Sequence, residues 1–175
     1  MSTRTAPSPS RIAPLALLCA LWTAPAAEGR TCDGSTRRVA VVGNLSATSA
    51  LIPDRFDGSS VEQAFNTASY QASVMVIDAH MREQELMFFF VHNAPGSWGL
   101  ALATFDPLAP GMGAVGSLRL FRFNADGRLT GSRRTVFTVR LDGMKPQRIV
   151  VDLSGMRSDL SQTGINSMQV SGCSR

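Results

Sequence analysis

The stretch LFRFNADGRLTG, residues 120–131, contains the side chains with the clearest potential for metal chemistry. Asn124, Asp126 and Gly127 supply two oxygen-bearing side chains and a glycine in the order that begins a helix-flanked calcium loop. Such a loop needs more oxygen ligands and a closing glutamate, but no acidic residue follows as far as Val139. The flanking residues alternate with the period of a strand. The pattern therefore predicts a β-hairpin turn, in which Asp and Gly tolerate positive φ.

Other side chains that could support catalysis or metal binding are scattered. His80 and His92 have no cysteine or pair of carboxylates close in sequence, which favours surface positions over a metal site. No serine occurs in the Gly-x-Ser-x-Gly motif. Glu83 and Glu85 fall on one face of an expected strand, which we expect to face solvent. The sequence thus predicts no enzyme, no metal site and no cofactor.

The N-terminal residues have the pattern of a targeting signal. Positive charge precedes an apolar run at 12–22, and the small-residue triplet APA follows it. We expect a signal peptide at 1–26, cleaved near Ala26 or Ala27, and export of 27–175 to the periplasm or the cell surface. The apolar run is too short for a permanent membrane span.

The chain has three cysteines, and their positions indicate which of them can form a disulfide after export. Cys19 lies in the expected signal peptide, so Cys32 and Cys173 remain, one near each end of 27–175. Exported compartments permit disulfides, and we expect a Cys32–Cys173 bridge that stabilises the domain by about 4–5 kcal/mol in the chain-entropy model. A metal site or a reactive thiol is the alternative, but no histidine lies close in sequence to either cysteine. A lipid anchor at Cys19 or Cys32 is a further alternative, although neither follows the usual lipoprotein pattern.

The composition indicates one globular domain with a hydrophobic core. The 175 residues are 44% hydrophobic and 17% charged. The formal net charge of +4 falls to +2 when Arg4 and Arg11 are removed with the signal peptide. Two arginine pairs, at 37–38 and 133–134, are interpreted as solvated strand ends. No Lys/Arg cluster alternates with aromatic residues, so the sequence predicts no nucleic-acid partner.

Short alternating segments separated by turn residues must position these side chains. They lie at 37–45, 69–78, 83–92, 98–105, 117–123, 133–141 and 147–153, with a last short strand at 167–170. A long loop follows the first strand, and a helical turn at 60–65 is compatible with it. Neither a repeat nor βαβ alternation is present. We therefore predict an all-β fold, a single antiparallel β-sandwich or small barrel-like domain.

The run FFFV at 88–91 places apolar side chains on both faces of its strand. Two interpretations are open: a strand covered on both faces, which is favoured, or an exposed aromatic patch. If the patch is exposed, Phe88, Phe90 and Trp98 form the candidate interaction surface.

Four segments, in order, resemble the outer β domain of flagellar hook and basal-body rod proteins. VVGNLSATSALIP resembles the opening of that domain, and the segment 70–102 resembles its long hairpin, including Trp98. GSLRLFRFNADGRLTG and RIVVDLSGMRSDLSQTGINSMQVSG resemble its later strands. The similarity covers 39–172, and FNADGRLTG and VVDLSGM are its best motifs.

The resemblance implies a structural role without enzymatic activity. Hook proteins carry terminal helices that build the inner tube of the filament, and they are exported without a cleaved signal peptide. We expect this chain to differ in both respects, as a stand-alone exported copy of the outer domain with a protein partner. The alternatives are an accessory component of the hook or basal body, and a periplasmic or surface β-sandwich that binds a glycan or a peptide.

Overall fold

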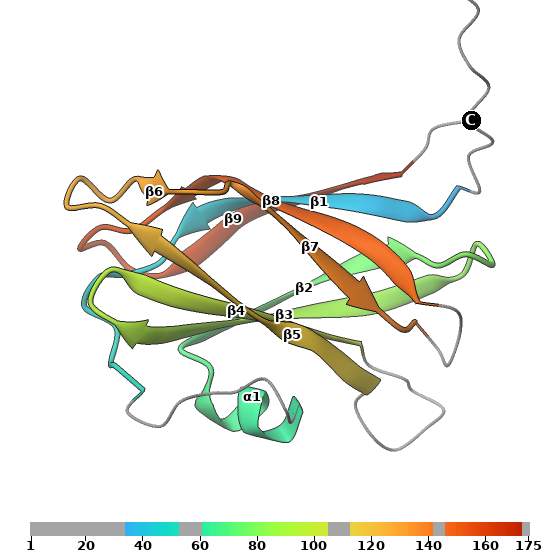
Figure 1. The fold of residues 1–175 in the computed structure, drawn as a ribbon, viewed down its shortest axis with the longest axis horizontal. Helices are drawn as coiled ribbons and strands as arrows, with labels where there is room; N and C mark the ends of the chain where they lie inside the picture. Colours follow the sequence, from blue (N-terminus) through green and yellow to red (C-terminus); the bar gives the residue numbers. More distant parts are fainter. Residues whose placement is uncertain (1–33, 53–60, 105–112, 142–145, 173–175) are drawn as a thin grey trace, which may run out of the picture. The chain divides into compact units, whose positions relative to one another are not determined.

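Two β-sheets face each other across a hydrophobic core, and a short helix lies on the outer side of one of them (Figure 1). The computed structural model describes residues 34–52, 61–104, 113–141 and 146–172. The helix is α1 (Val61–Thr67), and the strands are β1 (Thr36–Asn44), β2 (Tyr70–Ile77), β3 (Glu83–Ala94), β4 (Ser97–Thr104), β5 (Gly113–Phe123), β6 (Leu129–Thr130), β7 (Arg134–Val139), β8 (Gln147–Arg157) and β9 (Gly164–Gly172). No helix in the described ranges is long and apolar enough to cross a membrane.

The sheet topology confirms the predicted all-β class. One sheet has four strands in the order β7-β8-β1-β9, and the other has five in the order β2-β3-β4-β5-β6. Neighbouring strands run antiparallel with one exception, because β1 and β8 are parallel, with Val39 opposite Val151. The sequence does not predict this exception. Alternation along a chain locates strands, but it does not say which distant strands become neighbours.

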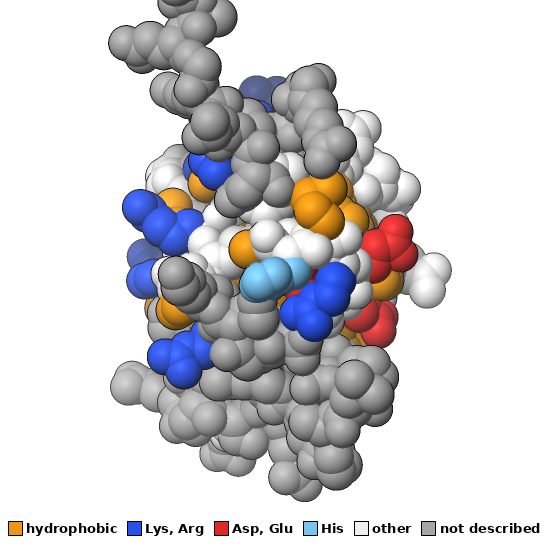
Figure 2. All heavy atoms as spheres, turned by 90° about the vertical axis from the view of Figure 1, so that its right-hand side faces the viewer, with side chains coloured by type: hydrophobic (Ala, Val, Ile, Leu, Met, Phe, Trp, Pro, Cys, Tyr) orange, Lys and Arg blue, Asp and Glu red, His pale blue; other side chains and the backbone are white. Residues whose placement is uncertain are grey.

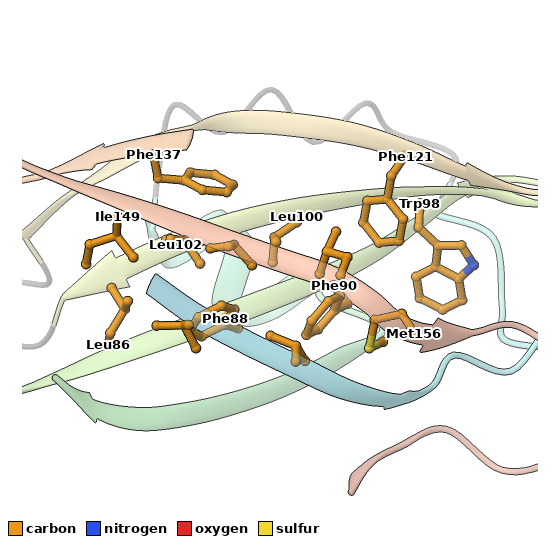
Figure 3. Packing of buried hydrophobic residues seen from close by; sticks show 14 of the residues in the cluster. Leu86, Phe88, Phe90, Trp98, Leu100, Leu102, Phe121, Phe137, Ile149 and Met156 are labelled. Atoms are coloured by element: carbon orange, nitrogen blue, oxygen red, sulfur yellow. The ribbon is translucent and has the colours of Figure 1, made fainter. Parts of the chain in front are cut away.

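The core between the sheets is built from inward side chains of both sheets. Phe88, Phe90, Trp98, Phe137 and Ile149 are among its largest members, and Figure 3 shows them converging between the strands. Burying a side chain of this size stabilises the fold by about 1.5–3 kcal/mol. The candidate interaction surface is therefore corrected: Phe88, Phe90 and Trp98 have 0% exposure and offer nothing to a partner.

A second apolar cluster covers the other face of the same strands. Phe89 and Val91 of β3 point away from the main core and pack with Ala101 and Ala103 of β4. The ring of Phe65 in α1 meets the ring of Phe89 edge-on, with centroids 6.0 Å apart. The run FFFV is thus covered on both faces, and this explains why it does not alternate.

Candidate interaction surface

The residues 124–127 form the turn between β5 and β6. The Gly127 amide donates to the Asn124 carbonyl at 3.0 Å, and the Asn124 amide donates to the Arg128 carbonyl at 2.9 Å. The Asn124 side-chain oxygen accepts from the Arg128 amide at 2.8 Å, so it stabilises the turn. Gly127 has a φ of 68°. The described residues contain no group of three His, Cys, Asp or Glu side chains placed to hold a metal ion.

This turn is joined to the end of β8. The Ser158 amide donates to the Gly127 carbonyl at 3.0 Å, and Arg128 forms an isolated antiparallel bridge with Arg157. A Cβ atom on Gly127 would lie 2.1 Å from the Ser158 carbonyl oxygen, so only glycine permits this approach. The segment FNADGRLTG therefore contacts Arg157 and Ser158, the two residues that directly follow VVDLSGM.

Arginines gather around the junction and line two hollows that adjoin each other. One hollow, of about 260 Å³, is lined by Arg128, Leu129, Arg133, Ser154, Met156 and Arg157. The other, of about 510 Å³, is lined by Gly131, Ser132, Arg133, Arg134, Asp152 and Ser154. Arg133 and Ser154 line both hollows, and we call the two adjoining hollows together the arginine groove.

Asp152 is the acidic residue of this groove, and its charge is already matched. Its side chain is 2% exposed and accepts hydrogen bonds from the Arg38 guanidinium, from Arg134 Nε at 3.1 Å and from the Ser154 amide at 2.9 Å. Burial raises the pKa of Asp152, but the hydrogen bonds from Ser154, Arg134 and Arg38 outweigh burial and hold the pKa well below its ordinary value. Asp152 is therefore ionised, and Arg38 and Arg134 balance it.

The hollow lined by Arg134 and Asp152 opens on the outer side of the four-stranded sheet. On β8, Ile149 and Val151 point inward to the core, so by alternation Arg148 and Asp152 point outward. The outward arginines of this sheet are Arg38, Arg134, Arg148 and Arg157, and we call this side the arginine face.

Basic and acidic side chains gather on different sides of the end of the molecule where β8 begins (Figure 2). Arg37 and Arg148 line a further hollow of about 420 Å³ at the end of the molecule where β8 begins. Figure 2 shows this end: most Arg side chains gather on one side, and the Asp and Glu side chains lie on the other side. Glu83 is among the exposed acidic residues, and it belongs to the five-stranded sheet. Charge is therefore distributed unevenly at this end of the molecule (Figure 2), although the five-stranded sheet also carries the exposed Arg119 and Arg122 on β5.

The two histidines occupy different environments. His80 is exposed in the turn between β2 and β3, as expected. His92 is only 2% exposed, which corrects the expected surface position. Its ring stacks on Trp98, with centroids 4.5 Å apart, and its Nδ1 lies 2.8 Å from the Ser49 carbonyl oxygen. This contact joins the loop after β1 to the five-stranded sheet.

Several predicted features lie outside the described residues. They are the signal peptide at 1–26 and the cysteines Cys32 and Cys173.

Comparison with known proteins shows a weak structural similarity and no family. No family model matches the chain, and no curated protein matches it. One similar solved structure is a 32 kDa fragment of the flagellar hook protein FlgE from Caulobacter crescentus, with a TM-score of 0.48 and 13% identity. The match covers 63% of this chain and 50% of that fragment, so the chain spans half of the fragment's length. A similarity of this size does not establish membership of a family.

The sequence alone does not reveal the arginine groove. Arg133 and Arg134 fit a solvated strand end, and Arg128 and Arg157 stand in segments far apart in the chain. Only the contact between the β5–β6 turn and β8 brings them together. One feature of the sequence could have indicated the groove. FNADGRLTG contains an arginine, Arg128, and VVDLSGM is followed directly by another, Arg157.

Proposed function

We propose that this protein is an exported, non-enzymatic interaction module of the hook outer-domain type, and that its arginine face contacts an acidic protein partner. The observation that carries this proposal is the gathering of four outward arginines on the four-stranded sheet. Arg38 and Arg134 balance Asp152, whereas Arg148 and Arg157 form no ion pair with any residue of the described ranges. A face with an excess of positive charge attracts an acidic surface and steers its approach.

The groove is poor in the groups that catalysis would need. Ser154 is the hydroxyl residue shared by both hollows, and among the described residues no histidine, cysteine or lysine lines either of them. Arginine stays protonated and so cannot act as a general base for a serine. These side chains are suited to holding an anionic group and not to transferring a proton.

Site-specific photo-crosslinking in the native cells tests the contact. A crosslinking amino acid replaces Val136, which is 37% exposed on β7 beside Val150 of the arginine face. The matched control is Leu120, which is 65% exposed on β5 of the other sheet. We expect a discrete adduct with an acidic protein from position 136 and none from position 120, with a yield that falls as salt is added. Equal adducts from both positions, or none from position 136, would contradict the proposal.

Export is the second part of the proposal, and the sequence pattern at 1–26 supports it. Intact mass of the protein recovered from the periplasm or the medium provides the test. Removal of the segment up to Ala26 or Ala27 is expected. Recovery of the uncleaved chain in the cytoplasm alone would contradict export.

A further inference from the structure

Three arginines of the groove form no ion pair with any of the described residues. They are Arg128, Arg133 and Arg157, and the ion pairs of the described ranges involve other arginines. The carboxylates near them already have hydrogen-bond donors: Asp152 binds Arg38 and Arg134, Asp159 accepts from Ser161, and Asp126 accepts from Asn124 at 3.3 Å. Arg128 and Arg133 are therefore available to a ligand, whereas Arg157 shares its charge with Asp159, whose pKa is lowered by hydrogen bonds from Ser161 and by the charge of Arg157.

The backbone holds these three arginines close together. Arg128 and Arg157 face each other as bridge partners, and the Arg133 carbonyl accepts from the Leu153 amide at 2.8 Å. Like charges placed opposite each other in a sheet repel, and this repulsion costs the fold stability. An anion bound between them relieves the repulsion. The backbone therefore fixes these arginines around one hollow before any ligand binds.

The shape and the chemistry of the groove indicate what kind of anion fits. The guanidinium group presents a planar fork of donors that matches a carboxylate with two hydrogen bonds. The two hollows adjoin each other, because both are lined by Arg133 and Ser154, so a chain with several carboxylates can reach both hollows whereas a single ion reaches only one. At Gly131, which lines the groove, no atom lies within 4 Å of the space that a Cβ atom would take, and this leaves the backbone accessible.

We infer that the arginine groove binds the carboxylates of an extended acidic segment of the partner protein. This inference rests on the proposed function and adds the chemistry of the contact. Arg128, Arg133 and Arg157 hold the carboxylates. Arg38 and Arg134 remain on Asp152 and limit the groove at that end.

Fluorescence anisotropy with a labelled hexaglutamate peptide tests the inference. We expect salt-sensitive binding by the purified protein, and no binding of hexaglutamine. Arg128→Gln, Arg133→Gln and Arg157→Gln should each weaken binding about fivefold, the effect of one exposed charge-assisted pair. Arg119→Gln and Arg122→Gln remove the same charge from β5, outside the groove, and should leave the affinity unchanged. Circular dichroism and the Tm of each variant check that the fold is intact.

Two results would overturn the inference. Equal weakening by the groove variants and the β5 variants would show attraction by net charge alone. Binding of inorganic phosphate or of phosphatidylglycerol vesicles through the same arginines, without binding of hexaglutamate, would assign the groove to phosphate groups. Loss of peptide binding with a retained crosslink from Val136 would refute this inference only, whereas peptide binding without any crosslink would refute the proposed function only.

Discussion

At the scale of single residues, Gly127 meets two requirements that no other residue type meets together. Its φ is 68°, and the Ser158 carbonyl oxygen occupies the space of a Cβ atom at 2.1 Å. Gly131 shares the first requirement, with a φ of 80°, but has no atom within 4 Å of that space. Gly131→Ala should therefore cost only the left-handed backbone conformation, about 1–2 kcal/mol. Gly127→Ala should cost about 3 kcal/mol or more, because the β5–β6 turn must also move away from β8.

Urea denaturation of the two glycine variants measures this difference. A larger loss of unfolding free energy in Gly127→Ala is expected, together with weaker hexaglutamate binding, since Arg128 follows Gly127 in the turn. Equal losses in both variants would show that the close approach to Ser158 does not matter.

Asp152 should make stability depend on pH in the acid range. Its pKa in the folded protein lies below the ordinary value of 3.8. The stabilisation is therefore fully present above about pH 4 and is lost as the pH falls toward the folded pKa. Asp152→Asn should lower the unfolding free energy by about 1–3 kcal/mol at pH 7. The unfolding free energy of this variant should also fall less steeply below about pH 4 than that of the unmodified protein. Urea denaturation of both proteins between pH 7 and about pH 3 gives the comparison. If the unfolding free energies of the two proteins changed in parallel with pH, Arg38 and Arg134 would not stabilise the carboxylate.

At the scale of elements, the positions of the strands along the chain could be predicted better than the pairing of one strand with another. Alternation and turn residues indicate β1 to β5 from local sequence, because each strand buries one face or, for β3, both faces. The parallel pairing of β1 with β8 is not encoded locally. β8 also continues beyond Leu153 to Arg157, and β9 begins at Gly164, in a tail whose residue pattern predicts mostly loop. The arginine groove depends on that continuation, so it could not be predicted either.

The helix α1 should be attached to the domain mainly through one aromatic contact. Phe65 is 45% exposed and meets the buried Phe89 edge-on, while Gln71 of β2 donates to the Phe65 carbonyl at 2.8 Å. Phe65→Ala should lower the unfolding free energy by only about 1 kcal/mol. The amides of α1 should nevertheless lose protection in hydrogen exchange, because the helix is too short to persist without packing.

Phe89→Ala should destabilise the whole domain, whereas Phe65→Ala should affect mainly α1. Phe89 has 0% exposure, so this change should cost about 3–5 kcal/mol and lower protection in β3 and β4 as well as in α1. Hydrogen exchange followed by mass spectrometry separates the local effect from the global one. Retained protection of α1 in Phe65→Ala would mean that other contacts hold the helix.

At the scale of the whole molecule, the described strands bring the two ends of the domain together. Thr36 at the start of β1 is opposite Gly172 at the end of β9, and a Cβ atom on Gly172 would lie 2.5 Å from the Ser35 carbonyl oxygen. In the sequence, Cys32 comes four residues before β1, and Cys173 follows Gly172 directly. The Cys32–Cys173 disulfide stays a prediction from the sequence, because both cysteines lie outside the described residues.

Such a disulfide should stabilise the domain mainly by restricting the unfolded chain. Because the closed loop includes nearly the whole domain, the double variant Cys32→Ser/Cys173→Ser should lose up to about 4–5 kcal/mol of unfolding free energy. Thiol labelling of the protein purified without a reductant should modify neither Cys32 nor Cys173 until a reductant is added. Reductant should lower the Tm of the unmodified protein and leave the double variant unchanged. Labelling of both thiols without reductant would show that the pairing of β1 with β9 alone holds the ends together.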